Sequence, residues 1–246
     1  MDLSRHIEIF SPDRVRLPIH IIGVGATGSF VAMMLARMGC PVLNIYDFDD
    51  VEAHNIPNQY YDNGDLGKLK VDALTEKLKL INPNIVVNKY SVPVAPVEDE
   101  EHKGIDKMSG YVFLLVDSMK VRQELWNAIK KNKEIVHVWE SRLGSDQARV
   151  YSLDMEEKDF SKYEQDFYSD DKAEVSACGT SITVLPVVLQ TASLMIVQFI
   201  DLVMDRIGTY YFKTIFSNTY DVYRESFKAP EVTNEVPVVN DVEDLF

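Results

Sequence analysis

The chain has little cysteine and a deficit of positive charge. Its 246 residues include two cysteines and 25 Lys and Arg against 39 Asp and Glu, so the net charge is −14. Two cysteines exclude a disulfide framework and a four-cysteine zinc site, and we expect a reduced, cytoplasmic protein. The acidic balance argues against a nucleic-acid partner, because phosphates favour a basic surface.

Long uninterrupted apolar runs are also missing. The N-terminus, MDLSRHIEIFSPDRVR, has no apolar stretch of the kind a signal peptide needs. The most hydrophobic stretch, residues 182–204, contains Gln190, Gln198 and Asp201. A membrane-spanning helix rarely tolerates such residues and a buried core helix does, so no membrane association is expected.

Basic residues are absent after Lys228. We therefore expect residues 226–246 to form an acidic, disordered tail. With 46% apolar residues, the preceding part of the chain can bury one good core. The sequence predicts one globular domain over residues 1–225.

Predicted strands and helices alternate along the chain. The strands are expected at 17–23, 42–46, 85–90, 111–116 and 135–139, and the helices at 26–38, 67–81, 120–130 and 181–204. This order predicts a doubly wound, Rossmann-like, mostly parallel sheet with helices on both faces. Residues 148–153 and 208–217 indicate an antiparallel C-terminal extension. The segment between them, 156–177, indicates a short helix and then a mobile loop.

Residues with binding chemistry follow three of the predicted strands. In an open parallel sheet the ligand binds beyond the carboxyl ends of the strands, where Gly23, Asp47 and Asp117 all stand. Gly23-x-Gly25-x-x-Gly28 suits a tight turn that brings backbone amides against phosphate. Asp47 has the position of an acid that binds a ribose hydroxyl. These features serve NAD and ATP equally.

Two lysines and a further carboxylate favour ATP. Lys68 and Lys70 could contact phosphates, and Asp117 could bind Mg²⁺. A nicotinamide enzyme needs neither. Taken alone, however, the lysines could equally be the solvated start of a helix.

The chain resembles the ThiF/MoeB/HesA superfamily of adenylating enzymes, which includes the ubiquitin-activating enzymes. The resemblance covers about residues 5–217 and rests on GVGATGS, YDFDDVEAHNIPNQ, DLGKLKVDAL, VDSMKVR and the cysteine before the long helix. It implies a homodimer that binds ATP and magnesium. It also implies adenylation of the C-terminal carboxylate of a ubiquitin-like or sulfur-carrier protein, followed by displacement of AMP by a thiol or sulfur nucleophile.

The resemblance assigns roles to individual positions. The nucleotide-binding residues would be Gly23, Gly25, Gly28, Asp47 on the ribose, Asp49, Asn55, Gln59 and Lys70 on the phosphates. Asp117 would hold magnesium, and Arg5 would reach into the site of a neighbouring subunit. Cys178, directly before the long helix, matches the cysteine that forms a covalent link, and a helix N-terminus favours a thiolate there.

One position departs from the family pattern. Asn58 stands where the Asn-x-x-Arg-Gln motif has its arginine, so the site lacks one charged donor. Losing such a donor typically costs about a hundredfold in rate. Either another cation replaces it, with Arg142 or Lys68 as the choices in this chain, or the protein adenylates slowly or not at all.

The remaining cysteine and the histidines have simpler interpretations. Cys40 is expected to pack in the core, and His54 to be a bystander near the site. The family's common zinc-binding Cys-x-x-Cys pairs are absent, so no zinc is expected. Three functions remain open: an ATP-dependent adenylyltransferase, a non-catalytic nucleotide-binding partner subunit, and an NAD-dependent oxidoreductase.

Overall fold

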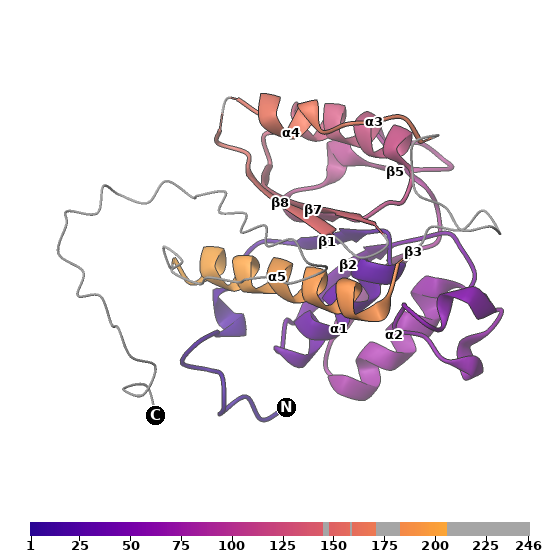
Figure 1. The fold of residues 1–246 in the computed structure, drawn as a ribbon. Helices are drawn as coiled ribbons and strands as arrows, with labels where there is room; N and C mark the ends of the chain where they lie inside the picture. The colour runs from indigo at the N-terminus through magenta and orange to yellow at the C-terminus, as the bar shows by residue number, and fades with distance from the viewer. Residues whose placement is uncertain (145–147, 158, 171–182, 206–246) are drawn as a thin grey trace, which may run out of the picture.

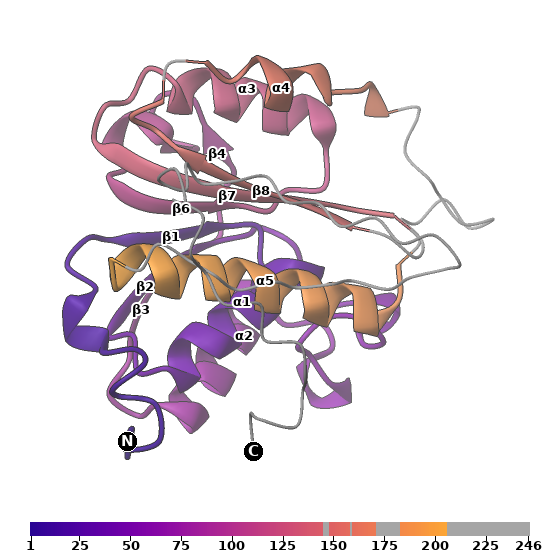
Figure 2. The same cartoon turned by 60° about the vertical axis from the view of Figure 1, so that its left-hand side comes forward.

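The fold is one mixed sheet between two helical layers. The computed structural model describes residues 1–144, 148–157, 159–170 and 183–205. Helices α1, α2 and α5 cover one face of the sheet, and α3 and α4 cover the other (Figure 1). The view in Figure 2 shows the same three layers. The predicted fold class is confirmed.

The elements lie close to their expected positions. The sheet contains β1 (Ile19–Ile22), β2 (Val42–Tyr46), β3 (Val86–Tyr90), β6 (Gly110–Leu114), β7 (Ile135–Leu143) and β8 (Ala148–Asp154). The helices are α1 (Ala26–Arg37), α2 (Lys70–Ile81), α3 (Met119–Ile129), α4 (Ser161–Gln165) and α5 (Leu185–Val203). A separate pair of short strands, β4 (Val94–Ala95) and β5 (Lys103–Gly104), was not expected. Four single 3-10 turns complete the described elements: Pro12–Arg14, Ala53–Asn55, Asn63–Asp65 and Ile105–Lys107.

The strand order determines which strand ends lie side by side at the edge of the sheet where a ligand could bind. It is β3-β2-β1-β6-β7-β8, parallel throughout except for the antiparallel β7–β8 pair. The chain leaves β1 toward β2 on one side and later returns to β6 on the other. The ends of these three strands therefore meet at a topological switch point, where ligands bind in such sheets.

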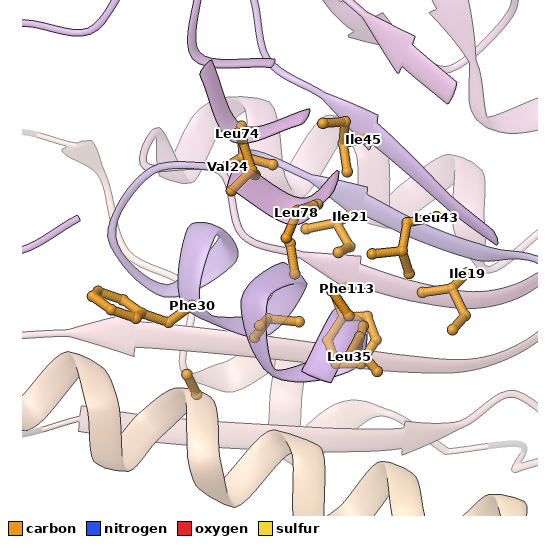
Figure 3. Close-up of a cluster of buried hydrophobic side chains, with 14 of the residues drawn as sticks. Ile19, Ile21, Val24, Phe30, Leu35, Leu43, Ile45, Leu74, Leu78 and Phe113 are labelled. Atoms are coloured by element: carbon orange, nitrogen blue, oxygen red, sulfur yellow. The ribbon is translucent and has the colours of Figure 1, made fainter. Parts of the chain in front are cut away.

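Side chains of the central strands alternate between two cores. Ile19, Ile21, Leu43 and Ile45 face α1 and α2 and pack on residues such as Leu35, Leu74 and Leu78 (Figure 3). Ile22, Val112 and Leu114 face the opposite way, toward Leu125, Trp126 and Ile129 of α3. Burial on both faces explains why these strands are nearly all apolar. Each such side chain contributes about 1.5–3 kcal/mol on burial.

Helix α5 belongs to the core, as expected of the apolar stretch. Its length and composition would also suit a membrane span, with half of its apolar window buried inside the protein. Its buried side chains belong to the same core cluster as residues of α1 and the sheet; they include Val188, Ala192, Met195 and Phe199. Phe199 meets the rings of residues on β6 and β7 as well as Phe10.

Several element boundaries differ from the prediction by two residues or more, among them the start of α2 and the end of β7. Helix α2 begins at Lys70 rather than residue 67, because residues 67–70 pair with residues 49–51. Strand β7 continues to Leu143 and pairs antiparallel with β8. The partner predicted for β8, residues 208–217, lies outside the described residues, as does the expected tail at 226–246, so that domain boundary stays a prediction.

Candidate active site

The glycine loop after β1 separates glycines that the fold needs from one that it does not. Gly23 has a φ of +91°, and a Cβ there would lie 2.6 Å from the Leu115 carbonyl oxygen. A Cβ on Gly28 would lie 2.0 Å from the Gly23 carbonyl oxygen. At Gly25 the nearest described atoms would be the Gln59 amide atoms, at 3.9 Å. The protein has room for a side chain at position 25. Because glycine has none, this space is open to a ligand.

Asp47 is fixed beside this loop by its own backbone neighbours. The Val24 amide donates to its Oδ2 at 2.9 Å and the Asp49 amide to its Oδ1 at 3.0 Å. Burial raises the pKa of the Asp47 carboxyl, and the Lys70 ammonium opposes that shift. Both oxygens keep lone pairs that could accept from a ligand hydroxyl, as the ribose-binding role requires.

Backbone pairing of the residues before α2 positions Lys70 in the site. The Lys70 amide donates to the Asp49 carbonyl at 2.9 Å, within the pairing of residues 49–51 with 67–70. Its ammonium, on a residue only 7% exposed, contacts Asp49 Oδ2 at 2.8 Å. The expected Asp47, Asp49 and Lys70 cluster is therefore present, with Asp49 as the partner of the cation.

Two hydroxyl-bearing side chains brace the loop and were not singled out from the sequence. The Tyr61 hydroxyl donates to the Val24 carbonyl at 2.8 Å and lies 3.4 Å from the Lys70 carbonyl. Ser29 accepts from the Tyr60 amide at 3.0 Å. Tyr61 thus ties the glycine loop to the start of α2. Nothing in the sequence marks this tyrosine, because the contact depends on the tertiary fold.

The two amides of the Asn-x-x-Arg-Gln region behave differently. Buried Asn55 accepts from the Glu52 amide at 2.9 Å through its side-chain oxygen and so shapes its own turn. The Gln59 side chain lies over Gly25, and its buried Oε1 has no hydrogen-bond partner among the described residues. A buried acceptor without a donor is costly, and a ligand donor at Gly25 would satisfy it.

Both proposed replacements for the missing arginine already have carboxylate partners. Lys68 points along α2, with Glu76 at 2.7 Å and Asp65 at 3.7 Å. Arg142 is buried and binds Glu140 and the Asp166 carbonyl. Burial lowers the pKa of Arg142, but the Glu140 carboxylate and the Tyr151 and Tyr163 side chains together more than offset that effect, so the pKa is raised. The expectation that Arg142 takes the place of the arginine missing at Asn58 is not supported by its surroundings.

Asp117 is exposed at the start of α3. The next residue, Ser118, caps the helix by accepting from the Val121 amide at 3.3 Å. Asp170 also binds there, accepting from the Met119 amide at 2.5 Å and from the Ser118 hydroxyl at 3.0 Å. These contacts leave the Asp117 side chain open to a ligand at the carboxyl edge of the sheet.

A magnesium ion shared with phosphates would fit this arrangement. The described residues contain no cluster of three or more His, Cys, Asp or Glu that could enclose a metal. Mg²⁺ is typically bound through one or two carboxylates together with substrate phosphates, so a single exposed Asp117 suffices.

Arg5 lies away from the site of its own chain. It is exposed on the N-terminal segment, whose Leu3 side chain would contact a Cβ placed on Gly39. Gly39 follows the end of α1, about 18 Å along the helix from Gly25. The role of Arg5 in the site of a neighbouring subunit stays a prediction.

The remaining predicted residues divide between the core, the surface and the segment that is not described. Cys40 is fully buried, and burial raises the pKa of its thiol to about 12, which confirms it as packing. His54 is exposed, with its Nδ1 3.4 Å from a Glu52 oxygen. Cys178 lies within residues 171–182, outside the described residues, so its role as a nucleophile stays a prediction.

Comparison with known proteins identifies the family of the chain. A ThiF family model matches residues 13–238. A tRNA threonylcarbamoyladenosine dehydratase from Haemophilus influenzae is 32% identical over 130 residues, covering 51% of this chain and 49% of the relative. Ubiquitin-like modifier-activating enzyme 5 from Oryza sativa subsp. japonica is 34% identical over 102 residues, covering 41% of this chain and 24% of the relative. The chain thus matches about half or less of the length of these curated relatives.

Solved structures share the fold at low identity. The E. coli tRNA N6-threonylcarbamoyladenosine dehydratase TcdA superposes with a TM-score of 0.61 at 18% identity, covering 82% of this chain and 94% of that one. The E. coli MccB structure with ATP gives a TM-score of 0.61 at 17% identity, covering 79% and 58%. Because the family model spans most of the sequence, the chain belongs to the ThiF family.

Proposed function

We propose that this protein is an ATP-dependent adenylyltransferase that activates the C-terminal carboxylate of a ubiquitin-like or sulfur-carrier protein. In this reaction a carboxylate oxygen forms a bond to the α-phosphorus of ATP, and the bond to pyrophosphate breaks. The observation that carries the proposal is the convergence of the Gly23–Gly28 loop, Asp47, Lys70 and Asp117 at one edge of the sheet in a ThiF family member.

Each part of the site would have a distinct task. The open space at Gly25 and the unpartnered Gln59 oxygen would receive the nucleotide. Asp47 would accept a ribose hydroxyl, and Lys70 would exchange Asp49 for phosphate oxygens. Asp117 would hold the magnesium ion, which neutralises phosphate charge when bound.

Two features favour ATP over NAD. Lys70 is a nearly buried cation at the edge where phosphates would lie, and the family's named members include a modifier-activating enzyme. Charge favours a protein or peptide as the second substrate. One relative is named as acting on tRNA, but a net charge of −14 makes this chain a poor match for nucleic acid. A protein or peptide carboxylate suits the acidic surface better, particularly on a carrier with a basic face.

One observation favours a second function, a nucleotide-binding subunit without adenylating activity. Asn58 removes a charged donor, and both candidate replacements, Lys68 and Arg142, already contact other groups. Such a subunit would bind ATP and activate or position another protein. It would keep Asp47 and Lys70 but fail to stabilise the transition state.

Pyrophosphate exchange separates the two functions. The assay measures return of labelled pyrophosphate into ATP, with the purified protein and a panel of ubiquitin-like and sulfur-carrier proteins. Carrier-dependent exchange that is lost in Lys70→Met supports adenylation. Lys79→Met is the control, because Lys79 lies in the last turn of the same helix, at the opposite end from Lys70. Binding of ATP without exchange for any carrier would favour the non-catalytic subunit.

A further inference from the structure

A fully buried carboxylate on β7, next to β6 in the sheet, lies between two arginines. Glu140 on β7 is 0% exposed, and it contacts the Arg122 guanidinium from α3. Arg142 binds the same carboxylate with two nitrogens, each at 3.2 Å. Two cations on one buried carboxylate leave an excess positive charge. Three backbone carbonyls absorb it, those of Val116, Ser141 and Asp166.

Arg142 is further enclosed by aromatic rings. Its guanidinium carbon lies 4.6 Å from the ring centre of Tyr151, 5.2 Å from that of Tyr163 and 5.0 Å from that of Phe167. Rings at these distances stabilise a desolvated cation. Replacing a buried charge network with apolar residues is often neutral or stabilising. Stability alone therefore does not explain why this site carries three charges.

The two arginines reach different parts of the chain. Arg122 donates to the carbonyl of Val116, the residue directly before Asp117. Arg142 donates to the carbonyl of Asp166, within the segment 159–170. Asp170, at the end of that segment, caps the helix that begins just after Asp117. The segment and Asp117 are therefore connected twice, once through Glu140 and once at the start of α3.

We propose that Arg122, Glu140 and Arg142 form a clamp that positions Asp117 and couples it to the segment 159–170. In this clamp Arg122 and Arg142 are positioning residues, and neither touches the nucleotide. Loosening the segment would displace Asp117, and a ligand that fixes Asp117 would order the segment. The metal-binding consequence rests on the proposed function, whereas the mechanical coupling does not.

Hydrogen–deuterium exchange on the nucleotide-free protein tests the coupling directly. Arg142→Lys keeps the charge but loses the forked contact to Glu140, and it does not touch Val116. Amides of both 159–170 and 115–121 should exchange at least about fivefold faster, since local opening follows the lost contacts. Faster exchange confined to 159–170, or no change in either, would overturn the clamp.

Arg149→Gln is the matched control. Arg149 contacts the side chain of the same Asp166 at 3.2 Å but is exposed. Its loss should leave residues 115–121 unchanged. If Arg142→Lys fails to melt cooperatively, Arg122→Lys is measured instead. It should loosen 159–170, because the Arg122 hydrogen bonds go to Glu140, Ser141 and Val116 and reach that segment only through Glu140. Unchanged exchange in that segment would overturn the clamp.

A magnesium titration supplies a second readout that a purely structural role would not move. For folded Arg142→Lys, we expect about tenfold more Mg²⁺ for half-maximal ATP binding, with metal-free ATP affinity within about twofold of the wild type. An unchanged Mg²⁺ requirement would contradict the positioning role. If the wild-type protein binds no ATP, the proposed function fails while the exchange experiment still decides the coupling.

Discussion

The two halves of the molecule hold their positive charges in opposite ways. In the half from β1 to α2, Lys70 meets one carboxylate, Asp49, whose side chain is half exposed. In the half from β6 to α4, Arg122 and Arg142 are buried against Glu140 and backbone carbonyls. A cation with one exposed partner can exchange it for a phosphate, but a buried cation with several partners cannot. In the proposed function the first half, with Asp117, would carry the chemistry, and the proposed clamp in the second half would set its geometry.

The largest expected effects come from two glycines of the first half. Gly28→Ala would place a Cβ 2.0 Å from the Gly23 carbonyl oxygen and should destabilise the fold by more than about 3 kcal/mol. Gly25→Ala has room within the protein and should melt within about 1 kcal/mol of the wild type, yet lose ATP binding. Thermal unfolding and calorimetry on both variants measure this difference. Intact ATP binding in Gly25→Ala would mean that the ligand does not approach the loop.

Restoring a cation to the first half should have the next largest effect. With Asn58→Arg we expect ATP affinity to stay within about threefold and pyrophosphate exchange to rise by about a hundredfold, the usual worth of one such donor. The direction follows because the donor acts on charge that develops in the transition state. A large loss of ATP affinity would show that the site is built around the amide.

A pH dependence of stability should come from buried histidines on the sheet. Burial lowers the pKa of His20 and of His137 from 6.5 to about 4. Between pH 6.5 and pH 4 these two histidines are therefore protonated in the unfolded chain but neutral in the folded protein. The free energy of unfolding should fall between pH 6.5 and pH 4, by roughly 3 kcal/mol for each histidine.

Variants isolate these contributions. His20→Gln and His137→Gln, unfolded in urea at several pH values, should each flatten the slope. Asp47, whose pKa is raised by burial, contributes in the opposite sense near the acid end of this range. A slope unchanged in both variants would contradict the assignment.

The smallest effect concerns the thiols. Burial holds Cys40 as an unreactive thiol, with a pKa of about 12. A disulfide reagent on the folded protein should therefore modify Cys178 and leave Cys40, and Cys178→Ser should show no fast reaction. Rapid modification of the Ser variant would show that the first half opens more readily than its packing indicates.

Much of the sheet could be predicted because its signals are local. Apolar strands such as Val42–Tyr46 and the helical spacing of α1 need only neighbouring residues. The start of α2 was misplaced because it depends on pairing with residues 49–51, which are remote in sequence. The end of β7 was missed because Glu140, Ser141 and Arg142 look solvated until the fold supplies their partners.

The site residues also divide into those marked by local motifs and those defined only by tertiary contacts. Gly23 and Asp47 could be predicted because each follows a strand, and Lys70 because of its motif; the structure brings the loop, Asp47, Asp49 and Lys70 together. Tyr61 and Arg122 could not, since their roles consist of contacts to carbonyls far along the chain. The surroundings of Arg142 could not be predicted for the same reason: sequence alone does not place the Glu140 carboxylate beside it.

Calorimetric titration with ATP and Mg²⁺, and separately with NAD, on the wild type and on Asp117→Ala tests the central claim most directly. We expect the wild type to bind ATP with Mg²⁺, to show no preference for NAD, and to bind ATP at least about tenfold more weakly after the substitution. Failure to bind ATP, or a preference for NAD, would contradict the nucleotide site and with it the proposed adenylation.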